Sequence, residues 1–296
     1  VKVVLDADDK KVLPRNIGIF GTVGSGKTNT AQVLIEEASA HGYAVIVIDI
    51  EGEYVNMDQP TTELIDKLKE FELSPDGLKD FFVYYPVAGE TSKERAIAFD
   101  IDFSSMEPSI LSEILNFTEA QERVFFELIE RLTSKVEEEK RKKKKEVEES
   151  EALRFLLGGP RPEEEKFTIL DAIRMLWDEF IPERRGGEKT SCYTLAKKLA
   201  MLRRSRIFDQ EEVSELQIPT LLRPGRVSVI DVSGCSEEVK NIVIAWLLRK
   251  VFDMKIEKPE ETPKTLIMIE EAHTFVSRER REKMGATLDM IRTIAR

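Results

Sequence analysis

Short apolar runs separated by polar stretches form the main pattern of the amino-acid sequence. Ala44–Ile50 is almost continuously apolar and rich in β-branched residues, as expected of a strand buried on both faces of a parallel sheet. Two further runs, Val227–Val232 and Thr265–Ile269, repeat this signature. Ile17–Phe20, a short apolar run that ends just before a glycine, predicts another buried strand, and Phe81–Val87 and Ala96–Phe103 are further candidate strands.

Apolar residues at helical spacing occupy segments between these strands. A helix is predicted over Gly26–Ala40, with Gly42 near its C-terminus. Glu237–Phe252 has apolar residues at the same spacing, namely Val239, Ile242, Val243, Trp246 and Leu247. Strands that alternate with helices indicate an α/β fold around a mainly parallel sheet.

The middle of the chain differs because helical periodicity dominates from Thr118 to about Trp177. Two more helices are expected at Thr168–Phe180 and Ser191–Arg206. We interpret this part as a helical insertion into the α/β core. The expected division is a first part of the core at residues 1–117, the insertion at 118–210 and a second part of the core at 211–296.

Composition and charge narrow the class of protein. The chain has 296 residues, of which 41% are hydrophobic and 34% charged, which is typical of a globular protein. Its net charge of −11 argues against a protein that coats nucleic acid with its whole surface, although it allows a local basic channel. Apolar runs such as Val243–Leu248 are far shorter than the ~20 residues of a membrane span. No membrane association is expected.

Other features concern the location and extent of the protein. The two cysteines, Cys192 and Cys235, make neither a disulfide scaffold nor a zinc site, which suits a reducing cytoplasm. No basic and apolar leader opens the chain, so we expect a cytoplasmic protein. Because it begins with a valine and stops at Arg296 within an amphipathic stretch, we expect a fragment of a longer polypeptide.

Gly21–Thr28 matches the motif G-x-x-x-x-G-K-[ST] completely and lies between a predicted strand and a predicted helix. Glycines let the backbone approach phosphate oxygens, and backbone N–H groups at the helix start form an anion cradle. A lysine then places positive charge on the β- and γ-phosphates of ATP, and the following hydroxyl can bind Mg²⁺. ATP is expected to bind at Gly21, Thr22, Val23, Gly24, Ser25, Gly26, Lys27, Thr28 and Asn29.

Glu270 and Glu271 directly follow the apolar run Thr265–Ile269. Alone, two glutamates after a strand are often surface residues. Beside a phosphate loop, the first can hold Mg²⁺ together with Thr28, and the second can act as general base for the attacking water. We therefore expect Lys27 and Glu271 to be catalytic, and Thr28 and Glu270 to be the metal ligands.

Further acidic residues follow other predicted strands. Asp49, Glu51 and Glu53 come at the end of the second strand, where ligands gather in open α/β sheets. They orient water or metal, or they cap the next turn, and both readings stay open. For Asp231 a structural role is favoured, whereas His273 either relays the nucleotide state or bonds locally.

Basic stretches raise the question of nucleic-acid contact. The tract Lys140–Lys145 lies within Lys135–Glu151, where seven basic and seven acidic residues cancel, so a solvated helix with i,i+4 ion pairs is favoured. Two other basic groups have a solvated face as the default reading and phosphate contact as the alternative. They are Lys197, Lys198, Arg203, Arg204 and Arg206, and Arg278, Arg280, Arg281 and Lys283.

Five motifs together resemble the ATPase core of the HerA family of DNA translocases. They are IGIFGTVGSGKTNT at 17–30, VIDIEGEY at 47–54, FTEAQ at 117–121, LLRPGRVSVIDVSG at 221–234 and IMIEEAHTFV at 267–276. Asn29 and the EEAH segment at Glu270–His273 are more specific than general ATPase motifs. The resemblance runs from about Pro14 to the end of the chain.

The resemblance implies a RecA-like P-loop ATPase that forms a hexameric ring, translocates double-stranded DNA and acts with a NurA-type nuclease in DNA-end resection. We expect no counterpart of the family's usual N-terminal β-barrel within these residues, and the trans-acting arginine has no clear counterpart, with Arg292 and Arg296 as the nearest candidates. Two alternatives stay open. One is a conjugation- or secretion-type pumping ATPase, and the other is a nucleotide-gated scaffold for a nuclease without translocation.

Overall fold

The structure, a computed structural model, describes residues 17–63, 65–147 and 166–272. The chain forms two compact units. The first combines the residues up to Phe99 with those from Val213 onward, and the second runs from Asp100 to Glu212. The predicted helical insertion, residues 118–210, lies within the second unit, which begins earlier than the sequence pattern indicates.

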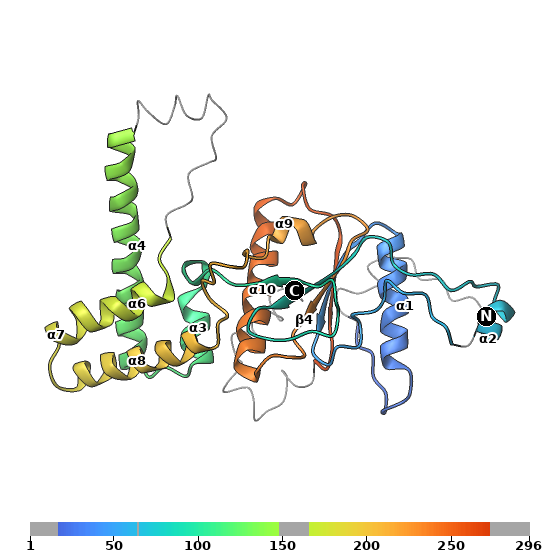
Figure 1. The fold of residues 1–296 in the computed structure, drawn as a ribbon, viewed down its shortest axis with the longest axis horizontal. Coiled ribbons are helices and arrows are strands. Elements are labelled where there is room, and N and C mark those ends of the chain that lie inside the picture. Colours follow the sequence, from blue (N-terminus) through green and yellow to red (C-terminus); the bar gives the residue numbers. More distant parts are fainter. Residues whose placement is uncertain (1–16, 64, 148–165, 273–296) are drawn as a thin grey trace. The chain divides into compact units, whose positions relative to one another are not determined.

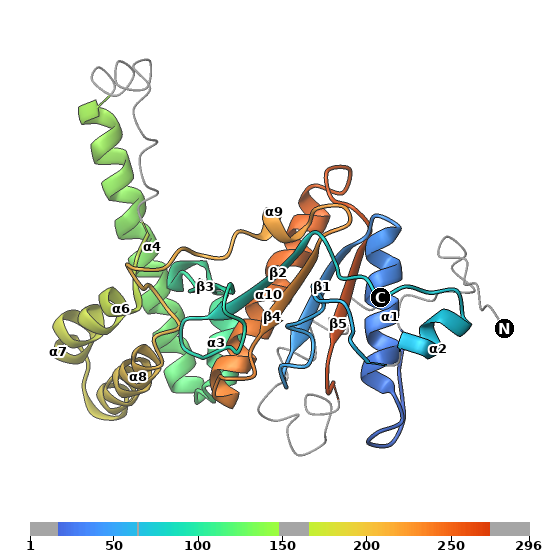
Figure 2. The same cartoon turned by 45° about the vertical axis from the view of Figure 1, so that its right-hand side comes forward.

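A parallel sheet of five strands organises the first unit in the order β3-β2-β4-β1-β5 (Figure 2). The strands are β1 (Ala44–Asp49), β2 (Phe81–Pro86), β3 (Ile97–Phe99), β4 (Val227–Asp231) and β5 (Thr265–Ile269). All residues of β1 and β4 are buried, as expected of strands covered on both faces. The predicted α/β fold around a parallel sheet is therefore confirmed.

Two long helices cover the opposite faces of this sheet, α1 (Lys27–Ala40) and α10 (Glu237–Glu257) (Figures 1 and 2). On the α1 side, Ala31 and Ile35 pack in a core with valines of β1 and β4. The apolar positions predicted on α10 are all buried. Two short helices, α2 (Ile65–Glu70) and α9 (Ile218–Leu221), complete the unit within the described residues.

Two of the strand predictions need correction. Ile17–Phe20 is irregular, and the side chains of Ile17 and Phe20 are 49% and 94% exposed. An apolar run becomes a strand only where a neighbour satisfies its backbone groups, and no strand in the described part of the chain pairs with this run. The strand predicted at Ala96–Phe103 shortens to β3, because Asp102 caps a 3₁₀ turn, η1 (Phe103–Ser105), by accepting from the backbone N–H of Ser104.

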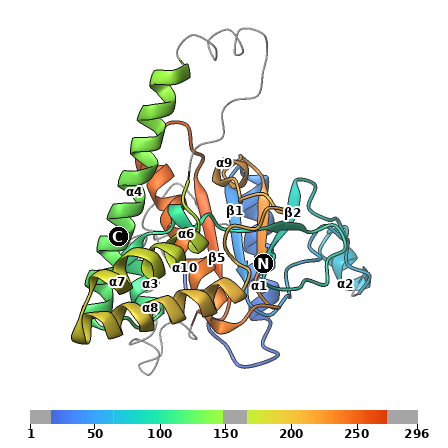
Figure 3. The ribbon, with the colours of Figure 1, turned by 60° about the vertical axis from the view of Figure 1, so that its left-hand side comes forward.

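The second unit is helical in its described part (Figure 3). Its helices are α3 (Pro108–Ile114), α4 (Glu119–Val147), α6 (Ile169–Met175), the π-helix η2 (Leu176–Phe180), α7 (Ile181–Glu183) and α8 (Gly186–Arg204). A capping box of Thr168 and Asp171 begins α6. Both α6 and α8 contact α4, and their core includes Phe125, Leu128, Leu195 and Leu199.

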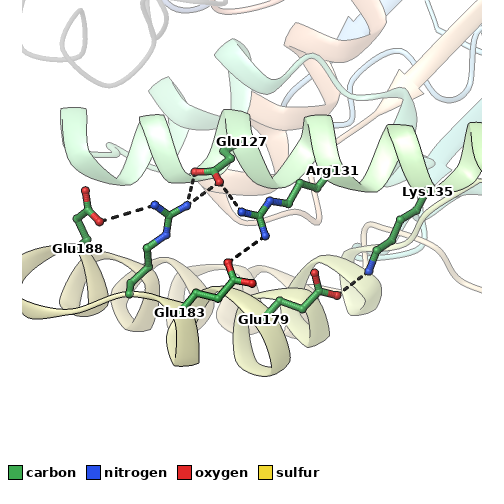
Figure 4. A network of polar contacts seen from close by, with 7 residues as sticks. Glu127, Arg131, Lys135, Glu179, Glu183 and Glu188 are labelled. Atoms are coloured by element: carbon green, nitrogen blue, oxygen red, sulfur yellow. Dashed lines mark hydrogen bonds and ion pairs between the residues drawn. The ribbon is translucent and has the colours of Figure 1, made fainter.

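A network of ion pairs joins α4 to residues 179–188 (Figure 4). Glu127 is its centre, because its carboxylate accepts hydrogen bonds from Arg131 at 2.8 Å and from Arg184 at 2.6 Å. The guanidinium carbon of Arg131 also lies 4.4 Å from the centre of the Phe180 ring. Three more ion pairs extend the network, Arg131–Glu183, Lys135–Glu179 and Arg184–Glu188.

We expect Glu127→Ala to lower the free energy of unfolding of the helical unit by about 1–3 kcal/mol, because two half-buried guanidinium groups lose a shared partner. Thermal unfolding followed by circular dichroism measures this change. Glu137→Ala on the same helix is the matched control. Glu137 pairs with Arg141 across 3.9 Å at an exposed position, so its loss is expected to change stability by less than about 0.5 kcal/mol. Equal effects of the two substitutions would contradict the importance of the network.

The basic tract Lys140–Lys145 lies on α4. The Glu137–Arg141 pair is one of the i,i+4 pairs that the sequence predicts, and both side chains are exposed. The arrangement supports the reading of this part as a solvated helix. None of the described helices combines the length and the apolar composition that a membrane span needs.

Candidate nucleotide-binding site

The loop before α1 has the backbone that a phosphate-binding loop requires. Gly24 and Gly26 have φ of 77° and 87°, in the left-handed region where any other residue is strained. A Cβ on Gly21 would lie 2.2 Å from the hydroxyl oxygen of Ser25. Gly26 is the N-cap of α1, so the unpaired N–H groups of the first helical turn follow directly after the glycines. These features fit a cradle for phosphate oxygens.

The first two residues of α1 contact the loop and the region after β1. The ammonium group of Lys27 donates to the backbone carbonyl of Thr22 at 3.4 Å, so its side chain folds back over the loop. The hydroxyl of Thr28 donates to a carboxylate oxygen of Glu53 at 2.7 Å. The start of α1 is thereby joined to the acidic segment that follows β1. Asn29, the next residue, is exposed.

The acidic residues after β1 divide into two roles. Asp49 is fully buried, and its carboxylate accepts hydrogen bonds from the backbone N–H groups of Gly52, Glu53 and Tyr54 at 2.7, 3.1 and 2.9 Å. It therefore caps the turn, which is one of the two readings left open by the sequence. Glu51 and Glu53 are exposed and remain available to a ligand.

Glu270 reaches the same place from β5. Ile48 of β1 pairs with Ile269 of β5, so the next residues, Asp49 and Glu270, lie at the same edge of the sheet. The Glu270 carboxylate accepts from the backbone N–H groups of Ile50 and Glu51, both at 3.1 Å. Burial, together with a hydrogen bond to Asp49 and the charge of that residue, raises the pKa of Glu270 to about 8. A positive charge close to Glu270 would favour its ionised form.

Carboxylate oxygens of Glu51, Glu53 and Glu270 lie within 4.8 Å of one another. Oxygen ligands of this kind suit Mg²⁺, and Thr28 is joined to the cluster through Glu53. The residues therefore fit a divalent cation beside a phosphate loop. Glu271 follows in a left-handed conformation with φ of 46°, which is uncommon for a non-glycine residue.

The comparisons with known proteins agree with this geometry. The family model described as "Helicase HerA, central domain" matches residues 1–251. The chain belongs to this HerA family. It is 21% identical over 273 residues to the DNA double-strand break repair helicase HerA of Sulfolobus acidocaldarius, and 22% identical over 276 residues to that of Saccharolobus solfataricus.

These matches cover 90% and 89% of this chain but 46% and 44% of the two relatives. The chain therefore spans about half the length of these HerA proteins. A probable DNA double-strand break repair helicase HerA of Methanocaldococcus jannaschii is 40% identical over 57 residues, which is 19% of this chain and 11% of that protein. The solved VirB4 structure of Thermoanaerobacter pseudethanolicus has a similar fold, with a TM-score of 0.52 and 15% identity over 93% of this chain and 66% of that one.

The site brings together residues from the phosphate loop and from the ends of two neighbouring strands. Lys27 and Thr28 lie at the start of α1, and Glu270 directly follows β5. Glu53, one of the candidates after β1, contacts Thr28 and belongs to the carboxylate cluster, which supports the reading that it orients water or metal. What the sequence does not predict is the direct contact between Thr28 and Glu53.

Other candidates of the sequence analysis have structural roles or lie elsewhere. A carboxylate oxygen of Asp231 accepts from the backbone and hydroxyl of Ser233, which supports the favoured structural role. Lys198 donates to the backbone carbonyls of Leu115 and Asn116, so it caps the end of α3. Seven residues lie outside the described part of the chain, namely His273, Arg278, Arg280, Arg281, Lys283, Arg292 and Arg296.

Gly26→Ala tests the loop conformation. The left-handed backbone at this position costs a residue with a Cβ roughly 1–2 kcal/mol, so we expect the affinity for ATP to fall about tenfold. Equilibrium titration with a fluorescent ATP analogue measures the loss. Gly187→Ala is the control, because an added Cβ there has open space and the backbone is helical. Unchanged affinity in Gly26→Ala would contradict a phosphate cradle at this loop.

Proposed function

We propose that this chain is the ATP-hydrolysing core of a motor that translocates double-stranded DNA. The observation that supports this proposal most is the contact between the start of α1, directly after the phosphate loop, and the carboxylate cluster. Thr28 bonds to Glu53 at 2.7 Å, and Glu53 lies in one cluster with Glu270 from the neighbouring strand. Such an arrangement suits metal-assisted transfer of a phosphoryl group to water.

The residues of the chain divide the chemistry as follows. The loop Gly21–Gly26 and Asn29 bind ATP, and the ammonium group of Lys27 stabilises charge that develops on the transferred phosphoryl group. Thr28 and Glu270 hold Mg²⁺. Glu53 lies in the same cluster, and its carboxylate can give up the hydrogen bond from Thr28 and contact the cation instead. When bound, Mg²⁺ neutralises phosphate charge and favours the ionised form of Glu270.

Glu271 is the general base in this proposal. It removes a proton from the attacking water, whose oxygen bonds to the γ-phosphorus while the bond to the bridging oxygen of ADP breaks. The products are ADP and inorganic phosphate. Each turnover changes the contacts at the carboxyl edge of the sheet, where β1 and β5 end. This edge is the point from which hydrolysis would drive motion.

We propose DNA as the substrate because the relatives are named DNA double-strand break repair helicases. We propose that the protein assembles as a homo-oligomeric ring of six subunits in the cytoplasm. It pumps duplex DNA and works with a NurA-type nuclease at DNA ends in repair. These parts of the proposal rest on family membership, because the chain spans about half of its relatives.

ATP turnover of the intact protein with and without duplex DNA tests the proposal. Strong stimulation by blunt duplex, together with displacement of a third strand from a triplex substrate, is expected of a translocating motor. Turnover that does not respond to DNA would overturn translocation and favour the nucleotide-gated scaffold. Adding the cognate nuclease to both arms tests whether resection of the duplex depends on ATP.

A further inference from the structure

The segment Arg184–Arg206, which includes α8, is strongly basic within an acidic chain. The net charge of the chain is −11, yet this segment has eight basic residues and a single acidic one, Glu188. The basic residues are Arg184, Arg185, Lys189, Lys197, Lys198, Arg203, Arg204 and Arg206. Such a local excess needs an explanation, because like charges repel along a helix.

Two of these cations stabilise the unit. Arg184 pairs with Glu127 in the network of Figure 4. Lys198 donates to the carbonyl oxygens of Leu115 and Asn116 at 2.9 and 2.8 Å, and burial lowers its pKa. Their contacts explain their presence without any ligand.

The remaining cations include three that share one face of α8 with an aromatic residue. Lys189, Tyr193, Lys197 and Arg204 follow one another at spacings of about one or two helical turns. The opposite face, with Leu195 and Leu199, is buried. Within the described residues, no carboxylate lies within ion-pair distance of Lys189, Lys197 or Arg204. We name these four residues with Trp177 the α8 face.

Trp177 extends the α8 face from the neighbouring π-helix η2. Its ring meets that of Tyr193 edge to face, with centroids 5.4 Å apart, and the two residues are 47% and 37% exposed. Tyr and Trp are enriched at interfaces, because each combines a large apolar ring with a polar group. Along the helix axis, Lys189 and Lys197 each lie about 6 Å from Tyr193, one on either side.

We propose that the α8 face binds single-stranded nucleic acid. Its cations pair with backbone phosphates, and an unpaired base stacks on the Trp177–Tyr193 pair. Alternation of cations with aromatic rings is the arrangement by which proteins bind single strands, whose bases are free to stack. Bases within a duplex are already stacked, so a duplex would use the cations alone. The α8 face adds to the proposed function a second nucleic-acid contact, outside the α/β core and independent of ATP hydrolysis.

An acidic protein segment is the competing partner for a basic face. It would use Lys197 and Arg204 but would gain no base stacking from Trp177. The chain has two tryptophans, and the other, Trp246, is buried. Stacking of a base on Trp177 should therefore quench its fluorescence, and this quenching should disappear in Trp177→Phe. Quenching distinguishes a nucleic acid from an acidic peptide.

The test measures binding of fluorescein-labelled oligothymidine to the intact protein without nucleotide. We expect Lys197→Glu combined with Arg204→Glu, and separately Trp177→Ala, to weaken binding about 10- to 100-fold. The charge variant should also reduce the dependence of affinity on salt. ATP turnover without DNA is expected to stay at the wild-type level in these variants. Lys140→Glu with Arg141→Glu on α4 is the matched control and should leave oligothymidine binding unchanged.

Unchanged oligothymidine affinity in the α8 variants would overturn the proposal. The proposal would also be overturned if the α8 variants lost binding to polyglutamate but kept binding to oligothymidine. That result would favour an acidic protein partner. Trp177→Phe guards against misfolding, because it keeps an aromatic ring and should retain most of the affinity while losing the tryptophan signal. Absence of ATP turnover alongside intact oligothymidine binding would count against the motor but not against the α8 face.

Discussion

Lys27→Ala is expected to reduce ATP turnover at least 100-fold and to abolish DNA-dependent activity. The substitution removes a positive charge from the phosphoryl group at the moment when negative charge develops there, an effect of roughly 3–4 kcal/mol for a single well-placed donor. In the structure, the ammonium group of Lys27 has a long 3.4 Å bond to the carbonyl of Thr22. Replacing this weak hydrogen bond with contacts to phosphate oxygens therefore costs little free energy. A steady-state phosphate-release assay measures the loss.

Two further measurements make the Lys27 result specific. Lys69→Ala is the matched control, because the side chain of Lys69 is 71% exposed and its ion pair with Asp66, across 3.5 Å, involves a side chain that is 98% exposed. It should leave turnover unchanged. The loop conformation depends on Gly24 and Gly26, so Lys27→Ala should fold with an unchanged melting temperature. Turnover above about a tenth of the wild-type rate would contradict the role of Lys27.

The sequence predicts those helices and strands of this fold whose formation depends mainly on the burial of their own apolar side chains. β1, β4 and β5 lie close to the predicted residues. All residues of β1 and β4 are buried, as expected of continuous apolar runs in a parallel sheet, whereas those of β5 are partly buried. α10 likewise has the predicted buried face. Ile17–Phe20 fails because strand formation depends on a partner strand, and an apolar run of four residues contains no information about that partner.

The same distinction applies to the site. A motif of adjacent residues predicts the loop conformation, since Gly24 and Gly26 take the left-handed backbone that only glycine adopts easily. The contact of Thr28 with Glu53 depends on the strand order and on the turn that Asp49 caps. The motif at Gly21–Thr28 and the acidic residues after β1 indicate neither of these when each is taken alone. The capping role of Lys198 is a further case. The backbone carbonyls that accept its hydrogen bonds, those of Leu115 and Asn116, lie at the end of α3 and far from Lys198 in the sequence.

Glu271→Gln is expected to lower ATP hydrolysis by about 100-fold or more while ATP binding persists. The amide keeps the size of the side chain but cannot accept the proton of the attacking water. The loop and Lys27 are unchanged, so nucleotide should remain bound as ATP. Retention of labelled ATP on the protein, followed by chromatography of the bound nucleotide, measures this trapped state. The left-handed backbone at Glu271 is kept by Gln, so the melting temperature should not change.

Glu270→Gln separates the base from the metal ligand. Glu270 lies in the carboxylate cluster and accepts two backbone N–H bonds, so its amide variant should weaken Mg²⁺ binding and raise the Mg²⁺ concentration needed for turnover. Glu271→Gln should leave that concentration unchanged and lower the maximal rate instead. Full turnover by Glu271→Gln at saturating Mg²⁺ would exclude Glu271 as the base. Because Glu51 and Glu53 belong to the same carboxylate cluster as Glu270 and are exposed, the search for another base would then start with them.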